Sequence, residues 1–216
     1  MFIFLFTPPV RTMKTDIVTM RDGTQLVLPV AENYKDCLNL IQSDLFRKRG
    51  KRVSHFRIIL QAVFNPFHDF MIWFRLCQHK GILFPWCVTM YRLYQNTHKI
   101  KIPLKTRIGY GCLICHRMCI VVHKNTVIGN NVNLSHFLNI GSNHNTPAVI
   151  GNEVYIGPMT CLVEDVQIGN NVTIGAGAVV TKDIPAAAIA AGVPAKIIRN
   201  EFRRPGHCWD VTANQQ

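Results

Sequence analysis

The sequence predicts a mainly β protein: a parallel β-helix of hexapeptide repeats, preceded by an α-helical N-terminal domain. After Ile100 an isoleucine, leucine or valine recurs every six residues, and glycine often follows it. A fixed period of this kind is the signature of a parallel β-helix. Before that point the apolar residues follow helical spacing instead. We therefore expect an irregular leader over 1–30, an α-helical domain over 31–99, the β-helix over 100–190 and a C-terminal tail over 191–216.

The N-terminal stretch MFIFLF is apolar, but it meets Pro8 and Pro9 and is far too short to span a bilayer. It also lacks the charged region and the small-residue cleavage site of a secretory signal. Without an export signal, we expect the protein in the cytoplasm. The eight cysteines of the chain would then be reduced thiols.

Four segments of the helical region have apolar residues at the spacing of one helix face. They read YKDCLNLIQSDLFRK, VSHFRIILQAVF, FHDFMIWFRLCQHK and WCVTMYRLYQ. X-Pro pairs punctuate them, as expected at helix boundaries. We expect Trp73, Phe74 and Trp86 to be aromatic residues of the core.

The repeat region has its own physical logic. Each hexapeptide makes one flat face and one corner, and its aliphatic residue fills the interior. One coil cannot bury its own apolar residues, so coils must stack. The aliphatic positions are Ile102, Ile108, Ile114 and Ile120, then Ile128, Leu134 and Ile140 after a two-residue slip, and Ile150, Ile156, Leu162, Ile168, Ile174 and Val180 after a loop. Three hexads per coil predict about four coils.

The stretch CLICH, from Cys112 to His116, matches the C-x-x-C-H pattern of c-type haem attachment. The hexad frame gives the two cysteines separate positions. Cys112 falls two residues before Ile114, at the small inward position, and Cys115 falls at the corner, where glycine usually stands. We interpret them as small hydrophobic residues and expect neither haem nor a metal ion. His116 then lies on the face of the coil.

Basic residues are concentrated in one part of the chain. The formal net charge is +12, and residues 44–107 hold thirteen Lys and Arg against two acids. Such a block suits phosphate groups, a nucleic acid or an anionic membrane, and a solvated basic face is the alternative. We expect no nucleic-acid binding, because the aromatic interleaving or groove-reading motif that it needs is missing.

The run IGNNVTIGAGAVVTKDIPAAAIAAGVPAKII at 168–198 resembles the C-terminal part of the hexapeptide-repeat acyltransferases. It is most similar to the branch of serine O-acetyltransferases and capsular or exopolysaccharide O-acetyltransferases. The resemblance extends to IGYGCLICHRMCIVV at 108–122, to VNLSHFLNIGSNHNTPAVIGNEVYIG at 132–157, and to parts of the helical region. It implies a left-handed β-helix, a homotrimer, and acetyl-CoA as cosubstrate in the cleft between subunits.

The resemblance also implies roles for single residues. His116 would be the general base that takes the proton of an acceptor hydroxyl, a role worth roughly 10²–10⁴-fold in rate. His136 and His144 would bind the acceptor, or His136 would position His116; solvent-exposed histidines are the alternative. The residues implied to bind acetyl-CoA are Gly157, Gly175, Ala176, Lys182, Gly192, Lys196 and Arg199. For the glycines, corner geometry alone is the alternative.

Three positions depart from the serine O-acetyltransferases. Cys115 and Lys101 stand where that branch has acids, and Thr146 stands where it has a second histidine. The ammonium group of an amino acid needs a carboxylate partner, so this site should bind serine poorly. We therefore predict transfer of acetyl to a sugar hydroxyl of a surface polysaccharide or its precursor, with peripheral contact to an anionic inner membrane face. The alternatives are a serine O-acetyltransferase of cysteine biosynthesis and a non-catalytic β-helix scaffold.

Overall fold

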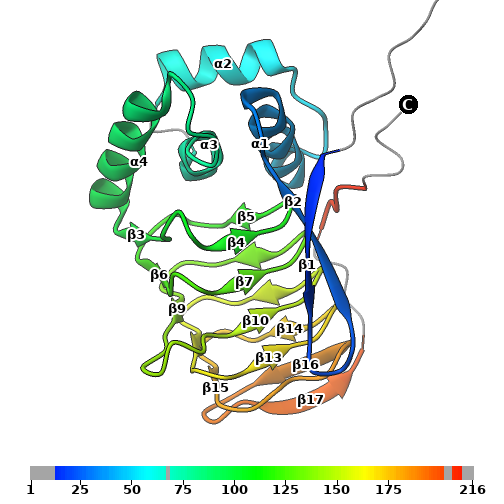
Figure 1. The fold of residues 1–216 in the computed structure, drawn as a ribbon. Helices are drawn as coiled ribbons and strands as arrows, with labels where there is room; N and C mark the ends of the chain where they lie inside the picture. The colour runs from blue at the N-terminus through cyan, green and yellow to red at the C-terminus, as the bar shows by residue number, and fades with distance from the viewer. Residues whose placement is uncertain (1–12, 67–68, 202–205, 211–216) are drawn as a thin grey trace, which may run out of the picture.

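The chain forms a β-helix with a small helical layer over one end and a β-hairpin along one side (Figure 1). The computed structural model describes residues 13–66, 69–201 and 206–210. The hairpin consists of β1 (Lys14–Thr19) and β2 (Gln25–Val30). The helices are α1 (Tyr34–Arg49), α2 (His55–Phe64), α3 (Phe70–Leu76) and α4 (Phe84–His98). Within the described residues, no helix combines the length and apolar character needed to cross a bilayer.

The helices lie where the apolar spacing predicted them. The side chains of Asn33, Ser54 and Asp69 accept hydrogen bonds from backbone amides in the first turns of α1, α2 and α3. Trp73 and Phe74 are buried, as expected. Trp86 was wrongly predicted as a core residue, because its side chain is 61% exposed. The buried positions of α4 are Cys87, Tyr91 and Tyr94, and Trp86 lies beside that face.

The repeat region is a left-handed parallel β-helix of about five turns. Its strands are β3 (Ile100–Lys101), β4 (Arg107–Ile108), β5 (Leu113–Ile114), β6 (Ile120–Val122), β7 (Val127–Ile128), β8 (Asn133–Leu134), β9 (Asn139–Ile140), β10 (Val149–Ile150), β11 (Tyr155–Ile156), β12 (Cys161–Leu162), β13 (Gln167–Ile168), β14 (Thr173–Ile174), β15 (Val179–Val180) and β16 (Ala188–Ala191). β17 (Lys196–Asn200) pairs antiparallel with β16 and ends the fold.

Three sheets form the faces of the β-helix, with the orders β15-β12-β9-β6-β3, β13-β10-β7-β4 and β17-β16-β14-β11-β8-β5. The aliphatic residues of the repeat stack inside, for example Ile150 between Ile128 and Ile168. The predicted number of coils, about four, was one too low. The last coil uses β15, an isolated bridge between Ile168 and Ile184, and β16. Ile184 follows Val180 after four residues, so this coil leaves the hexad period.

The two-residue slip in the period lies inside β6. Ile120 pairs with Ile100 of the first coil, whereas Val122 pairs with Ile140 of the third. Both Ile120 and Val122 are buried. One strand therefore holds two core residues, and the frame resumes at Ile128 without a break in stacking.

The N-terminal residues are not an irregular leader where they are described. β1 and β2 pair in register from Lys14 with Val30 to Thr19 with Gln25. Leu26 and Leu28 are buried, and with Met20 they pack on Val127 of β7. The hairpin thus covers the sheet of β4, β7, β10 and β13, which explains why these short alternating strands are stable. Residues 1–12 of the predicted leader lie outside the described residues.

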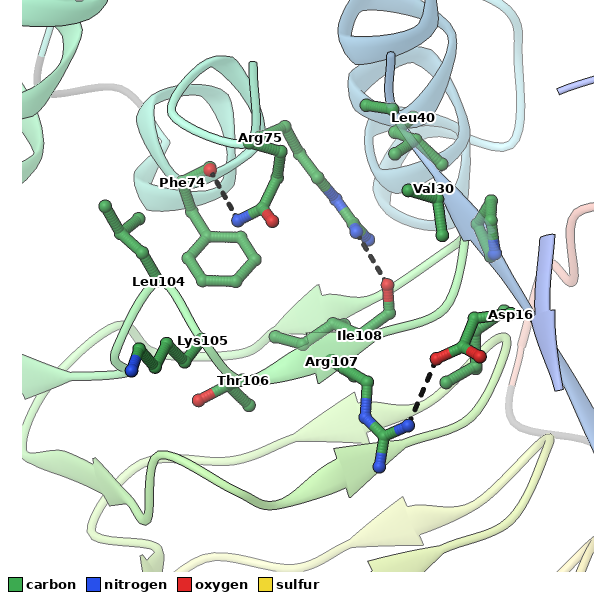
Figure 2. A pocket seen from close by; sticks show the side chains of 14 residues that line it. Asp16, Val30, Leu40, Phe74, Arg75, Leu104, Lys105, Thr106, Arg107 and Ile108 are labelled. Atoms are coloured by element: carbon green, nitrogen blue, oxygen red, sulfur yellow. Dashed lines mark hydrogen bonds and ion pairs between the residues drawn. The ribbon is translucent and has the colours of Figure 1, made fainter. Parts of the chain in front are cut away.

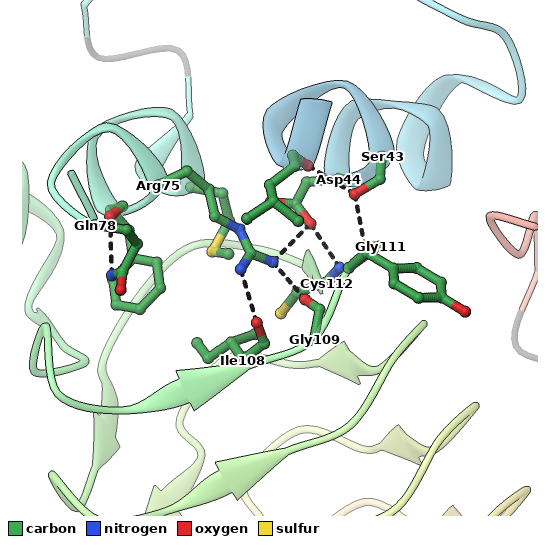
Figure 3. A network of polar contacts seen from close by, with 12 residues as sticks. Ser43, Asp44, Arg75, Gln78, Ile108, Gly109, Gly111 and Cys112 are labelled. Carbon is green, nitrogen blue, oxygen red and sulfur yellow. Dashed lines mark hydrogen bonds and ion pairs between the residues drawn. The ribbon is translucent and has the colours of Figure 1, made fainter. Parts of the chain in front are cut away.

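A buried ion pair joins the helical layer to the first coil (Figure 3). Arg75 of α3 donates to the Asp44 carboxylate of α1, with Nε 2.8 Å and Nη2 3.1 Å from the two oxygens. Arg75 also donates to the carbonyls of Ile108 and Gly109 at 2.8 and 2.5 Å. Asp44 accepts the amide of Cys112 at 2.7 Å. Both side chains are satisfied, so their burial does not leave a charge unpaired.

A C-terminal segment returns to the helical end of the molecule. Trp209 exchanges two backbone hydrogen bonds with the Asn131 side chain, at 2.8 and 3.0 Å. Its ring lies edge-on to Phe46 of α1, with centroids 5.3 Å apart. Arg47, which is buried, donates to the carbonyl oxygens of Gly111 and His207. The segment 206–210 is therefore fastened to α1 and the first two coils.

Replacing one member of the buried ion pair should be costly. Asp44→Asn leaves the Arg75 guanidinium buried without its counter-charge, and we expect a loss of about 3–5 kcal/mol in the free energy of unfolding. Asp44→Leu with Arg75→Met should recover only part of that loss, because it removes the buried charges but leaves the carbonyls of Ile108 and Gly109 and the amide of Cys112 without their partners. Urea unfolding monitored by circular dichroism measures both.

The matched control is Asp16→Asn. Asp16 pairs with Arg107 at 3.1 Å, and these side chains are 47% and 49% exposed. An exposed pair contributes only about 0–1 kcal/mol. Equal losses for Asp44→Asn and Asp16→Asn would show that the buried pair has no special role.

Candidate active site

His116 and His136 lie together on one corner of the β-helix. This histidine corner joins the β5-containing sheet to the β6-containing sheet and consists of residues 115–119, 135–138, 157–160 and 175–178 of successive coils. His116 is exposed and His136 is half-buried. Their ring centroids are 5.3 Å apart with an interplanar angle of 79°. The structure therefore pairs the predicted base with one of the two predicted acceptor histidines.

One ring nitrogen of this pair has no partner in the protein. The Nδ1 atom of His136 is buried, and no described residue hydrogen-bonds to it. The His136 ring is also 5.4 Å from the Phe137 ring, at 67°. Since a buried polar atom normally has a partner, this unpaired nitrogen is an exception at the histidine corner.

The backbone of the histidine corner runs as a continuous hydrogen-bonded ladder. The amides of Phe137, Met159 and Gly177 donate to Met118, His136 and Pro158, all at 2.8 to 3.1 Å. Phe137 and Met159 adopt left-handed φ values of 56° and 59°, and His116 adopts 48°. Gly and Asn are the usual residues in that region. The large side chains here are therefore a departure from ordinary corner chemistry.

An exposed apolar row lies beside the two histidines. Met118, Phe137 and Met159 occupy the corner in the first three of its coils and are 49%, 47% and 65% exposed. Sequence reasoning missed this row. The available signal was the bulky residue directly after LSH and IGP, where other corners have Asn131 or Asn171.

The residues predicted to bind acetyl-CoA do not all lie at the same place on the β-helix. Gly157, Gly175 and Ala176 continue the histidine corner, and Gly192 follows on the last coil, where its carbonyl accepts the Val179 amide. A Cβ on Gly157 would lie 2.7 Å from the Ala176 nitrogen, and one on Gly175 would lie 2.8 Å from the Ala191 Cβ. Coil stacking alone thus requires glycine at these two positions, in agreement with the alternative that corner geometry explains them.

Lys196 and Arg199 are exposed on β17, at the end of the molecule far from the helices (Figure 1). Lys196 pairs with Ala191, next to Gly192, so it extends the line of the histidine corner. Arg199 pairs with Ile189 and lies 3.8 Å from Glu201. Both basic side chains are therefore accessible from solvent.

His144 and Lys182 lie on a different corner. This loop corner, residues 141–148, 163–166 and 181–183, leads from the β9-containing sheet to the β10-containing sheet. His144 Nδ1 is 3.0 Å from Glu164, and its backbone amide also donates there at 2.9 Å. The hydrogen bonds from His144 lower the pKa of the partly exposed Glu164 carboxyl. Within one chain the structure does not bring His144 or Lys182 to His116.

The CLICH cysteines do not converge. Cys112 is 1% exposed inside the core, and burial raises the pKa of its thiol to about 12. Cys115 is half-buried at the corner, directly before His116. In residues 13–66, 69–201 and 206–210, no cluster of three or more His, Cys, Asp or Glu is arranged to hold a metal ion.

A cavity of about 160 Å³ lies away from the histidine corner (Figure 2). It opens between the hairpin, α1, α3 and the start of the β-helix, with Val30, Leu40 and Phe74 among its apolar lining residues. The Asp16–Arg107 ion pair stands at its side. None of the predicted site residues lines it.

Comparisons with known proteins agree on one kind of protein. Residues 147–182 match the family model described as bacterial transferase hexapeptide (six repeats). The chain is 38% identical over 118 residues to serine acetyltransferase 3, mitochondrial, of Arabidopsis thaliana, covering 50% of this chain and 30% of that protein. It is 41% identical over 109 residues to galactoside O-acetyltransferase of Escherichia coli, covering 47% and 54%. The chain thus spans roughly a third to a half of these relatives.

The fold is also that of a solved enzyme. Serine acetyltransferase of Brucella abortus in complex with coenzyme A superposes with a TM-score of 0.58 at 21% identity, over 78% of this chain and 68% of that one. At this identity the likeness concerns the fold. It extends beyond the repeats, because 78% of the chain is more than the β-helix alone.

Gly157 of the histidine corner gives a test of the stacking argument. Gly157→Ala places a methyl group against the backbone of the next coil, and we expect a loss of about 1–3 kcal/mol in the free energy of unfolding. Gly141→Ala is the matched control, because its new Cβ would have its nearest neighbour at 3.9 Å. That variant should stay within about 0.5 kcal/mol. Thermal or urea unfolding of the two proteins decides, and equal stabilities would contradict the close approach.

Proposed function

Because this chain belongs to the hexapeptide-repeat acyltransferases, we propose that it transfers acetyl from acetyl-CoA to an acceptor hydroxyl, with His116 as the general base. The observation that carries the proposal is the exposed His116, paired with His136 at 5.3 Å on a corner continued by small residues. The scaffold alternative is less well supported, because both curated relatives are named as acetyltransferases.

The proposed chemistry needs one proton transfer at His116. The imidazole accepts the hydroxyl proton while the acceptor oxygen bonds to the thioester carbonyl carbon. A tetrahedral oxyanion forms; when it collapses, the carbon–sulfur bond breaks, and the imidazolium returns the proton to the departing thiolate. Such an oxyanion is stabilised by hydrogen-bond donors held beside the thioester carbonyl. His136, on the next coil, lies where it can orient His116 or contact the acceptor.

Small residues support acetyl-CoA binding along the histidine corner. Gly157, Gly175 and Ala176 lie on successive coils of this corner, and Gly192 continues the line. Lys196 and Arg199 offer exposed cations at its far end for the phosphates of CoA. Since Lys182 lies on the loop corner, it would meet such a ligand only from a neighbouring copy.

We also propose a homotrimer with the site between copies. The exposed Met118, Phe137 and Met159 would be covered by a neighbouring chain. The hairpin occupies one of the three sheets, which leaves the other two for contacts. In a closed ring each contact joins two different surfaces of the chain. Histidine corner against loop corner would thereby bring His144 and Lys182 of one copy to His116 of the next.

Serine is the acceptor that the comparisons support best. Serine acetyltransferases occur among both the curated relatives and the solved structures. This favours serine, which the sequence offered as the alternative acceptor, over the sugar hydroxyl that was predicted first. A sugar hydroxyl stays the second candidate, because Cys115, Lys101 and Thr146 replace the acids and the histidine expected for serine, and because the Escherichia coli relative is named for a galactoside.

The test is acetyl-CoA consumption by the purified protein, followed by chromatography because the eight thiols of the chain react with thiol reagents. We expect turnover with L-serine or with a galactoside, and His116→Ala should lower it by roughly 10²–10⁴-fold. His55→Ala, on α2 and outside both corners of the β-helix, is the control and should retain activity. Absence of turnover with all acceptors, or equal rates for the two variants, would contradict the proposal.

A further inference from the structure

The outermost element of the helical layer is α2, and it presents an apolar face to solvent. Figure 1 shows α2 at the end of the molecule opposite β16 and β17, running across the axis of the β-helix. The one buried residue of α2 is Ile58, which packs with Ile41, Leu45, Val53 and Ile72. Phe56, Ile59, Leu60, Val63 and Phe64 are 70%, 49%, 38%, 67% and 81% exposed.

These five residues form one face. At 100° per residue they fall within an arc of roughly 140°, with Ile58 roughly opposite its centre. A surface helix ordinarily points such a face at the core and its polar side at water. In α2 the arrangement is reversed, since only Ile58 and Ala62 pack on the core while the widest apolar arc faces outward. Contiguous exposed apolar side chains of this kind mark a docking surface.

Exposed cations border this face. Lys48, Lys51 and Arg57 are exposed beside it. No Asp or Glu occurs between Asp44 and Asp69. An apolar helix face bordered by cations matches the boundary between head groups and acyl chains of an anionic bilayer. We propose that α2 and this basic border, the α2 surface, dock on an anionic lipid membrane.

The same charges disfavour a second copy of the chain as the occupant. Two α2 surfaces packed together would oppose the exposed Lys48, Lys51 and Arg57 of each copy, with no acid in residues 45–68. An anionic leaflet supplies negative charge and an apolar layer together. The α2 axis runs across the β-helix, so α2 lies flat on a membrane while the coils point away from it.

Docking would bring the proposed reaction close to the membrane surface. β5 and His116 belong to the first coil, directly beneath the helical layer (Figure 1). If the proposed transfer holds, the histidine corner opens close to the lipid surface, where an acceptor anchored in the membrane would present its hydroxyl. In the proposed trimer, with its axis along the β-helix, three α2 surfaces would face the same plane and bind together.

The test is sedimentation of the full chain with vesicles, without acetyl-CoA or acceptor. We expect binding to phosphatidylcholine vesicles containing phosphatidylglycerol, little binding to phosphatidylcholine alone, and weakening by salt. Phe56→Ser/Val63→Ser/Phe64→Ser should weaken binding by roughly tenfold or more, because each exposed apolar group buried in lipid adds affinity. Lys48→Gln/Lys51→Gln/Arg57→Gln should weaken it and reduce the effect of salt.

The matched control is Ile17→Ser/Val27→Ser, which removes two exposed apolar side chains from the hairpin, 56% and 44% exposed, and should bind like the unaltered chain. No binding to anionic vesicles, or equal binding by the α2 variant, would overturn the proposal. A lower oligomeric mass of the α2 variant in sedimentation velocity, without loss of vesicle binding, would assign the surface to self-association. His116→Ala should bind vesicles normally, so the docking and the proposed acetyl transfer fail separately.

Discussion

The buried contact between Arg75 and Asp44 is the interaction on which the arrangement of the molecule depends. It joins α1, α3 and the first coil at one point, because Arg75 holds the carbonyls of Ile108 and Gly109 while Asp44 holds the amide of Cys112. Buried ion pairs contribute little net stability compared with apolar packing, but they tolerate few alternative geometries. Cys112 directly precedes β5, and β5 leads into His116. The position of His116, the candidate base, therefore depends on how the helices pack on the first coil.

The two ends of the β-helix are closed by different means. A stack of parallel strands would otherwise present unpaired edges, which invite further strands. At one end the helical layer covers the first coil, and Phe70, Tyr91 and Tyr94 join the core of the coils. At the other end β17 turns back antiparallel on β16. The corner that carries the histidines runs between these two closures and is left open along its length.

Much of this could be read from the residues, and the failures have physical causes. The His116–His136 pair follows from arithmetic, since three hexads plus the two-residue slip separate stacked positions by about twenty residues. The fifth coil was not predicted because Ile184 leaves the six-residue period. The hairpin was not predicted because β1 and β2 are short and gain stability by packing on Val127. The outward face of α2 has ordinary helical spacing, and spacing alone does not tell which side of a helix meets the core.

The return of residues 206–210 to α1 changes what kind of repeat protein this is. A simple solenoid is a row of coils in which each touches only its neighbours, so an outer coil can melt while the others persist. Here the chain that leaves the last coil is fastened to the second coil through Trp209 and Asn131, and to α1 through His207 and Arg47. Residues 206–210 are held by the helical end of the row, so loosening of that end also releases the segment that follows the last coil. The two ends of the row are thereby coupled, and the coils are expected to lose their structure together.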